Sequence, residues 1–166
     1  MSTASFKRAA GSAVFGSLIA LATACAVAPV SAADSGKFNM KYTENQPIPV
    51  EDAQGHAIYL GNASGPAIGG SVDGAKVSAR EFVDIVNGTG SGRGYTTISK
   101  DGETAIYKHE GKIKTTMSDK GQPDTRFEGE AVNVKPGLGK KMGEKVAYKG
   151  YFTSPTDYVV EWRAIE

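Results

Sequence analysis

The chain has 166 residues, with 19 Lys and Arg against 18 Asp and Glu, two His, one Trp and one Cys. Its length suits one domain of ordinary size. The nearly balanced charge disfavours a nucleic-acid-binding protein, whose affinity depends on a cationic surplus. A single Cys excludes an internal disulfide framework and any multi-cysteine zinc or iron–sulfur site. We therefore expect a small domain with no cofactor and no nucleic-acid partner; the oligomeric state stays open.

The first 33 residues predict a secretory signal peptide. A short start containing Lys7 and Arg8 precedes an uncharged, apolar stretch from Ala9 to Ala28, and small residues lead to a cleavage site after Ala33. The densest part of that stretch is shorter than the roughly 20 residues that a membrane-spanning helix needs. The Ala-rich leader is typical of bacteria, so we expect export to the periplasm or the medium. The expected organisation is a signal peptide over 1–33 and one domain over 34–166.

A second route of export stays open at Cys25. The segment Leu21-Ala22-Thr23-Ala24-Cys25 resembles the lipobox of bacterial lipoproteins, in which the Cys is lipidated. The usual pattern has Leu three residues before the Cys, whereas here it lies four before, so cleavage after Ala33 is the preferred prediction. That cleavage leaves 133 residues with 17 basic against 18 acidic side chains, no Cys, and no apolar run long enough for a membrane span.

The rest of the chain alternates between polar and apolar residues in short segments separated by glycine, which indicates a β-sandwich or a barrel. The expected strands are 38–43, 56–62, 94–99, 103–110, 112–117, 126–134, 144–153 and 158–165. The prolines of 46–49 predict a connector, and the glycine-rich 61–74 predicts a long surface loop. Lys100-Asp101-Gly102 predicts a tight hairpin turn, and Gly111 predicts a break or a bulge.

One segment, 78–88, supports two interpretations. Ser78 to Glu81 forms a capping box, apolar residues with helical spacing follow, and Asn87-Gly88 is a good helix stop. The same residues alternate as a strand, with Val83 and Ile85 on one face. Local signals favour a short helix, and the resemblance described next favours a strand, which is the preferred prediction.

Four motifs after Glu81 resemble a known barrel family. They are the glycine-rich turn 87–95, the turn 100–103, the stretch 135–143 and the aromatic strand ending in Glu161-Trp162-Arg163. In this order they resemble secreted bacterial proteins with an allene oxide cyclase-like or dirigent-like (calycin-like) β-barrel, in which an Asp-Gly-Asp hairpin and a Gly-Gly-Thr-Gly-Lys turn recur. Here Glu103 replaces the second Asp, and 135–140 lacks the Gly-Gly-Thr core. The resemblance implies an all-β fold: a single closed antiparallel barrel of about eight strands with a possible ligand lumen. It implies no single activity.

Few residues carry recognisable chemistry. His56 and His109 lie 53 positions apart without metal-ligand spacing, so we expect no metal site even with Glu110 beside His109. No nucleophile motif is present, and no catalytic residue is predicted. His109 shares a predicted strand face with Tyr107 and would point into a lumen, and Trp162 lies on the last strand. His109, Tyr107 and Trp162 are therefore the candidate ligand-binding residues.

A turn rich in lysine is interpreted as solvated surface, with contact to an anionic lipid or polysaccharide as the alternative; it contains Lys135, Lys140, Lys141 and Lys145.

These observations predict an exported small β-barrel that binds a small or apolar ligand and is not favoured as an enzyme. An eight-stranded barrel holds either one small ligand or its own side chains. Two alternatives stay open. One is a cyclase or isomerase working in the lumen, which needs a polar group such as His109 or a buried carboxylate. The other is a cell-envelope interaction protein or lipoprotein with no small ligand.

Overall fold

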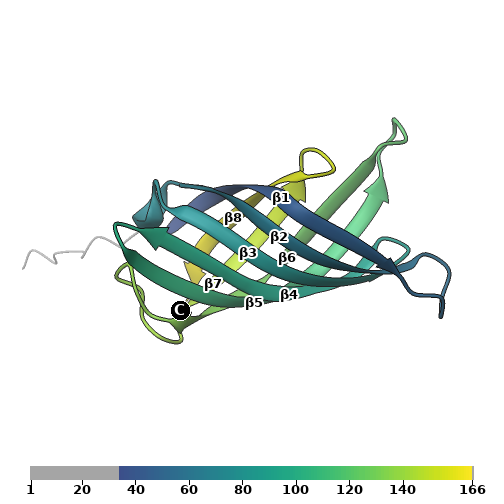
Figure 1. Ribbon diagram of the computed structural model, residues 1–166. Helices are drawn as coiled ribbons and strands as arrows, with labels where there is room; N and C mark the ends of the chain where they lie inside the picture. Colours follow the sequence, from purple (N-terminus) through teal and green to yellow (C-terminus); the bar gives the residue numbers. More distant parts are fainter. Residues whose placement is uncertain (1–33, 166) are drawn as a thin grey trace, which may run out of the picture. The chain divides into compact units, whose positions relative to one another are not determined.

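Residues 34–165 form a closed barrel of eight strands in the computed structural model, which describes these residues (Figure 1). The predicted signal peptide, its cleavage site after Ala33 and Cys25 lie outside the described residues. The strands are β1 (Ser35–Pro49), β2 (His56–Ile68), β3 (Lys76–Val86), β4 (Thr89–Lys100), β5 (Glu103–Met117), β6 (Pro123–Lys135), β7 (Lys145–Phe152) and β8 (Asp157–Ile165). Each pairs antiparallel with the next, and β1 closes the barrel on β8. The predicted all-β, closed antiparallel fold is confirmed.

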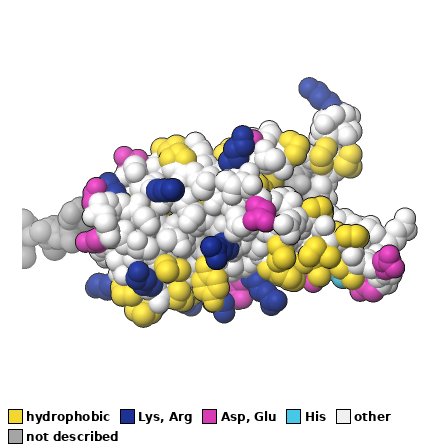
Figure 2. Space-filling model, viewed as in Figure 1, with side chains coloured by type: hydrophobic (Ala, Val, Ile, Leu, Met, Phe, Trp, Pro, Cys, Tyr) yellow, Lys and Arg dark blue, Asp and Glu magenta, His cyan; other side chains and the backbone are white. Residues whose placement is uncertain are grey.

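Alternation along each strand determines which side chains face the interior. On β1, Phe38 and Met40 are buried while their neighbours Lys37, Asn39 and Lys41 are exposed. Outward positions carry many Lys, Arg, Asp and Glu side chains, which are spread over the face seen in Figure 2. The interior is therefore mostly apolar, and the outer surface carries charged side chains among polar and some apolar ones.

The segment 78–88 contributes strand β3 and no helix. Along β3, every residue from Lys76 to Val86 pairs in register with β2 on one side and with β4 on the other. These two ladders satisfy the backbone groups that a short helix would have satisfied internally, and they also bury the inward face. The preferred strand prediction is confirmed, and the capping-box signal is overridden by tertiary pairing. Among residues 34–165, the helical structure is one 3-10 turn, η1 (Gly70–Val72).

The connector expected over 46–49 is wrong, because β1 continues to Pro49. Beyond Lys41, β1 pairs with β2 alone, since its pairing with β8 covers Ser35 to Lys41. Beyond Lys41, the backbone groups on one side of β1 therefore have no neighbouring strand with which to form hydrogen bonds. Prolines are tolerated at such an edge because they have no N–H to donate.

Two other expected interruptions are also wrong. The surface loop predicted over 61–74 is strand as far as Ile68, so that only the stretch containing η1 connects β2 to β3. Strand β5 runs through Gly111 without a break, and the register of β5 against β6 shifts instead between Ile106 and Tyr107. The predicted hairpin turn is confirmed: Asp101 and Gly102 have φ of 51° and 82°, the left-handed conformation that a two-residue hairpin needs.

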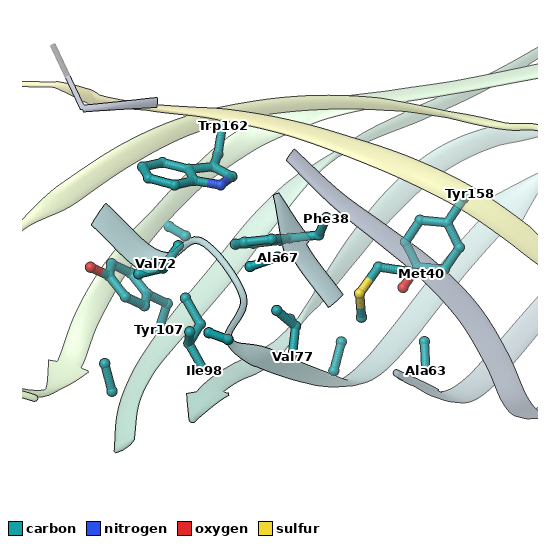
Figure 3. Packing of buried hydrophobic residues seen from close by; sticks show 14 residues of the cluster. Phe38, Met40, Ala63, Ala67, Val72, Val77, Ile98, Tyr107, Tyr158 and Trp162 are labelled. Atoms are coloured by element: carbon teal, nitrogen blue, oxygen red, sulfur yellow. The ribbon is translucent and has the colours of Figure 1, made fainter. Parts of the chain in front are cut away.

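The packed core lies toward one end of the barrel, which we call the closed end. It includes the η1 residue Val72 and the β3 residue Val77, which are almost fully buried. Figure 3 shows Trp162, Val72 and Tyr107 at one side of this cluster, Phe38 beside Ala67 in its middle, and Met40 and Tyr158 at the other side. Phe38 and Trp162 stack with ring centroids 6.0 Å apart. Large aromatic rings thus pack together at the closed end.

Candidate ligand-binding cavity

A cavity of about 660 Å³ occupies the barrel interior and is lined by side chains from all eight strands. Its deep part reaches Trp162 and Tyr107 at the closed end. Its other part reaches Gln122, Pro123 and Pro155, which are exposed residues in or beside the loops at the opposite end. We call this the open end; it carries the β1–β2 and β5–β6 loops, at the right of Figure 1. A ligand would therefore enter between these loops.

The closed end is held by a small polar network outside the core. Lys140, in the β6–β7 connection, donates to Asp34 at 2.5 Å and lies 3.2 Å from Glu144. Asp34 also accepts a hydrogen bond from the Ser71 backbone amide at 2.9 Å. Burial alone would raise the pKa of Asp34, but the hydrogen bonds from Lys140 and Ser71 outweigh it and lower the pKa. The lysine-rich turn is thus not wholly solvated, because the Lys140 side chain is only 11% exposed.

An aromatic wall lines one side of the cavity, built from β1, β6, β7 and β8. Its members are Tyr42, Phe127, Tyr148, Phe152 and Tyr158. Neighbouring rings are in contact across strands, with centroids 5.1 Å apart for Tyr42 and Tyr158 and 5.3 Å apart for Phe152 and Tyr158. Such rings offer both apolar surface and electron-rich faces to a ligand.

Inward-facing glycines give these rings their room. A Cβ added to Gly61 would meet the Tyr42 ring at 2.6 Å, and one added to Gly111 or Gly129 would meet the Tyr148 hydroxyl at 2.5 or 2.6 Å. The Tyr42 ring and the Tyr148 hydroxyl thus occupy space beside glycines of other strands, where a Cβ would not fit.

Glu81 is a carboxylate inside this largely apolar lumen. It belongs to the inward row of β3, after the buried Val77 and Ala79. Tyr42 donates its hydroxyl to Glu81 Oε2 at 2.5 Å, and Tyr158 donates to Oε1 at 3.0 Å. Burial, followed by the negative charge of Glu81, raises the pKa of both phenols, so they stay protonated donors.

His109 lines the same cavity from β5. Its Nδ1 is 3.0 Å from Thr96 Oγ1, and its ring meets Tyr148 edge-on at 6.1 Å. Burial lowers the pKa of His109, while the charge of Glu81 acts weakly in the opposite direction. The imidazole is therefore neutral at pH 7 and does not offset the charge of Glu81.

The three ligand-binding residues predicted from the sequence, His109, Tyr107 and Trp162, all line the cavity. Tyr107 and Trp162 lie in its deep part, and His109 lies farther toward the middle. Sequence reasoning missed Glu81 and most of the aromatic wall. The signal for Glu81 was available in the alternation of β3, where it is the one charged residue in the row Val77, Ala79, Glu81, Val83, Ile85.

The second histidine lies apart from the cavity. His56 begins β2 beside the open end, where Asp52 and Asp84 flank its ring; Nε2 is 2.9 Å from Asp84. Hydrogen bonds to Asp52 and then Asp84 raise the pKa of His56. Across 34–165, no three His, Cys, Asp or Glu side chains are grouped as metal ligands. No helix in that range has the length and apolarity to cross a membrane.

The fold and its interior define a class of protein: a closed eight-stranded antiparallel β-barrel with a partly aromatic cavity open at one end. Comparison of the chain with protein-family models, with curated proteins and with solved structures gives no match.

Proposed function

We propose that this protein is an exported barrel whose lumen binds one small, largely apolar molecule. The observation that carries the proposal is the cavity of about 660 Å³, which is within the size range of small-molecule sites. It is apolar and aromatic over most of its wall, with a few convergent polar groups, as such sites are. An eight-stranded barrel is wide enough for one such ligand.

Export is part of the proposal and rests on the leader sequence. The order of a basic start, an apolar stretch and small residues before Ala33 supports a soluble exported form, with lipidation at Cys25 as the alternative. Kinship with the allene oxide cyclase-like barrel group is proposed on the turn motifs described above and on the closed eight-stranded architecture.

A lumen-based isomerase or cyclase is the second candidate, and one observation favours it. Glu81 and the neutral His109 are two titratable groups of the same apolar cavity, which is the setting for general acid–base catalysis. Binding is preferred because both carboxylate oxygens of Glu81 already accept hydrogen bonds from phenols, so each is engaged in a contact within the protein.

Mass spectrometry of the protein expressed with its own leader tests the proposal. A denatured mass equal to 34–166 in the periplasmic fraction is the expected result, and a diacylated mass starting at Cys25 would indicate the lipoprotein route instead. Extra mass that is present under native conditions and lost on denaturation is expected for a bound ligand. Native protein without extra mass, and without uptake of any apolar molecule offered to it, would overturn the binding function.

A further inference from the structure

The carboxylate of Glu81 inside the lumen indicates the charge of the ligand as well as its apolar character. We propose that the ligand is a hydrophobic monocation: an amine or quaternary ammonium compound whose cationic head lies beside Glu81 and whose apolar body extends toward the open end. This inference rests on the proposed binding function and adds the chemical class of the ligand.

The first argument is that Glu81 has no cation of its own. No ion pair among residues 34–165 includes Glu81. Of the basic residues that border the cavity, Lys140 is already held by Asp34 and Glu144, and Arg93 and Lys112 are exposed. His109 is neutral for the reason given above. A carboxylate in an apolar cavity is costly to leave without a counter-charge, so a cationic ligand is the species whose binding the site favours.

The second argument concerns hydrogen bonding. An ionised carboxylate has about four lone-pair directions. Tyr42 uses one oxygen of Glu81 and Tyr158 uses the other, one hydrogen bond each. Both phenols stay protonated, so they orient the carboxylate without neutralising it. The remaining lone pairs are available to an N–H donor, and the negative charge is available to a quaternary head.

The third argument is the aromatic wall around the carboxylate. Tyr42 and Tyr158, which bond Glu81, are themselves in contact with Phe152 at centroid distances of 6.1 and 5.3 Å. A cation over an aromatic face within about 6 Å is stabilised, more strongly where water is excluded. A carboxylate bordered by such rings suits a cation and disfavours an anion, which both the carboxylate and the ring faces would repel.

The geometry also limits the length of the ligand. From Glu81 to Val86, where β3 ends at the open end, the strand advances five residues, or about 17 Å along its axis. Strands in such barrels tilt by about 40° from the barrel axis, so the depth is about 13 Å. Between these points the lining is apolar, with Val83, Ile85 and Ile113 facing the lumen. A linear chain of medium length attached to a cationic head fits this path.

The test uses three probes with one body and different heads: octylamine, octanol and octanoate. Isothermal titration calorimetry at pH 7 with the mature chain measures each affinity, and the emission of Trp162, the sole tryptophan, reports occupancy. We expect octylamine to bind at least about tenfold more tightly than octanol, and octanoate to bind least tightly. Glu81→Gln should remove the preference for octylamine over octanol. Glu128→Gln, the same chemical change at an exposed position of β6, should leave it unchanged.

The outcomes separate the two proposals. If octanol binds as tightly as octylamine, or if Glu81→Gln keeps the preference, the cationic ligand class is overturned while the binding function stands. If none of the three probes binds and native mass spectrometry shows no cargo, the binding function itself fails. The comparison of head groups needs only the unmodified protein, so it decides the question even if Glu81→Gln does not fold.

Discussion

Truncating two phenylalanines of the barrel interior to alanine should have very different consequences. Phe38 is 8% exposed in the packed closed end, where it stacks on Trp162. Phe152 is only partly buried and lines the cavity. Phe38 also borders the deep part of the cavity, but its ring is almost fully buried, so Phe38→Ala forfeits nearly all of that burial and costs about 3 to 5 kcal/mol. Phe152→Ala enlarges a space that already exists and forfeits only part of a ring's burial, so we expect a loss of about 1 to 2 kcal/mol.

Urea unfolding of the ligand-free protein, followed by circular dichroism, measures both losses as shifts in the midpoint at constant slope. Circular dichroism is preferred to fluorescence because Phe38→Ala also changes the surroundings of Trp162. Equal losses for the two variants, or a larger loss for Phe152→Ala, would refute the distinction between a packed closed end and a hollow remainder.

Three further predictions concern glycine, histidine and the closed end. Gly111→Ala should lower the unfolding midpoint, because the added Cβ would meet both a backbone oxygen and the Tyr148 hydroxyl. Gly92→Ala should be neutral or stabilising, because the nearest neighbour of its added Cβ is a side-chain methyl at 3.2 Å. Folding lowers the pKa of His109, so the stability that His109 contributes is present above pH 6.5 and is lost as the pH falls below that value. Folding raises the pKa of His56, so the stability that His56 contributes is present below pH 6.5 and is lost as the pH rises. NMR titration should give the two rings pKa values on opposite sides of 6.5, and values in the reverse order would contradict the burial of His109. Lys140→Met should lower the free energy of unfolding by about 1 to 2 kcal/mol in thermal unfolding at pH 7. An unchanged free energy of unfolding would show that the ion pair of Lys140 with Asp34 does not stabilise the barrel.

Alternation in the sequence predicts the fold where each strand has one apolar face. Phe38 and Met40 on β1, and Tyr158 and Trp162 on β8, are all buried as the period of two requires. The Asp101-Gly102 turn is predicted for a local reason as well, since both residues tolerate left-handed backbone. Strand alternation and this turn depend on residues that are close in the sequence, so they can be predicted from the sequence alone.

What the sequence conceals depends on partners that are distant along the chain. The glycines of 61–74 look like loop residues, but Gly61 lies in β2 beneath the ring of Tyr42, which is 19 positions away. Glu81 looks like the last residue of a capping box, but it faces the lumen and bonds Tyr158, which is 77 positions away. In both cases the residue's role is set by barrel closure, which a local pattern does not contain.

The sizes of the inward-facing residues explain why this barrel contains a cavity. Three successive inward positions of β4 are Gly90, Gly92 and Gly94, while β8, four strands away and so across the closed barrel, carries Tyr158 and Trp162. These three positions of β4 contribute no side-chain volume to the interior, while Tyr158 and Trp162 line the cavity from β8. The interior of an eight-stranded barrel is just wide enough either to be filled by side chains or to hold one small ligand, and three inward positions without side chains favour the second case. Glu81 stands on β3, next to the glycine-rich wall, and its phenol partners reach it from β1 and β8. The empty space and the charge that faces it thus follow from the same choice of residues on neighbouring strands.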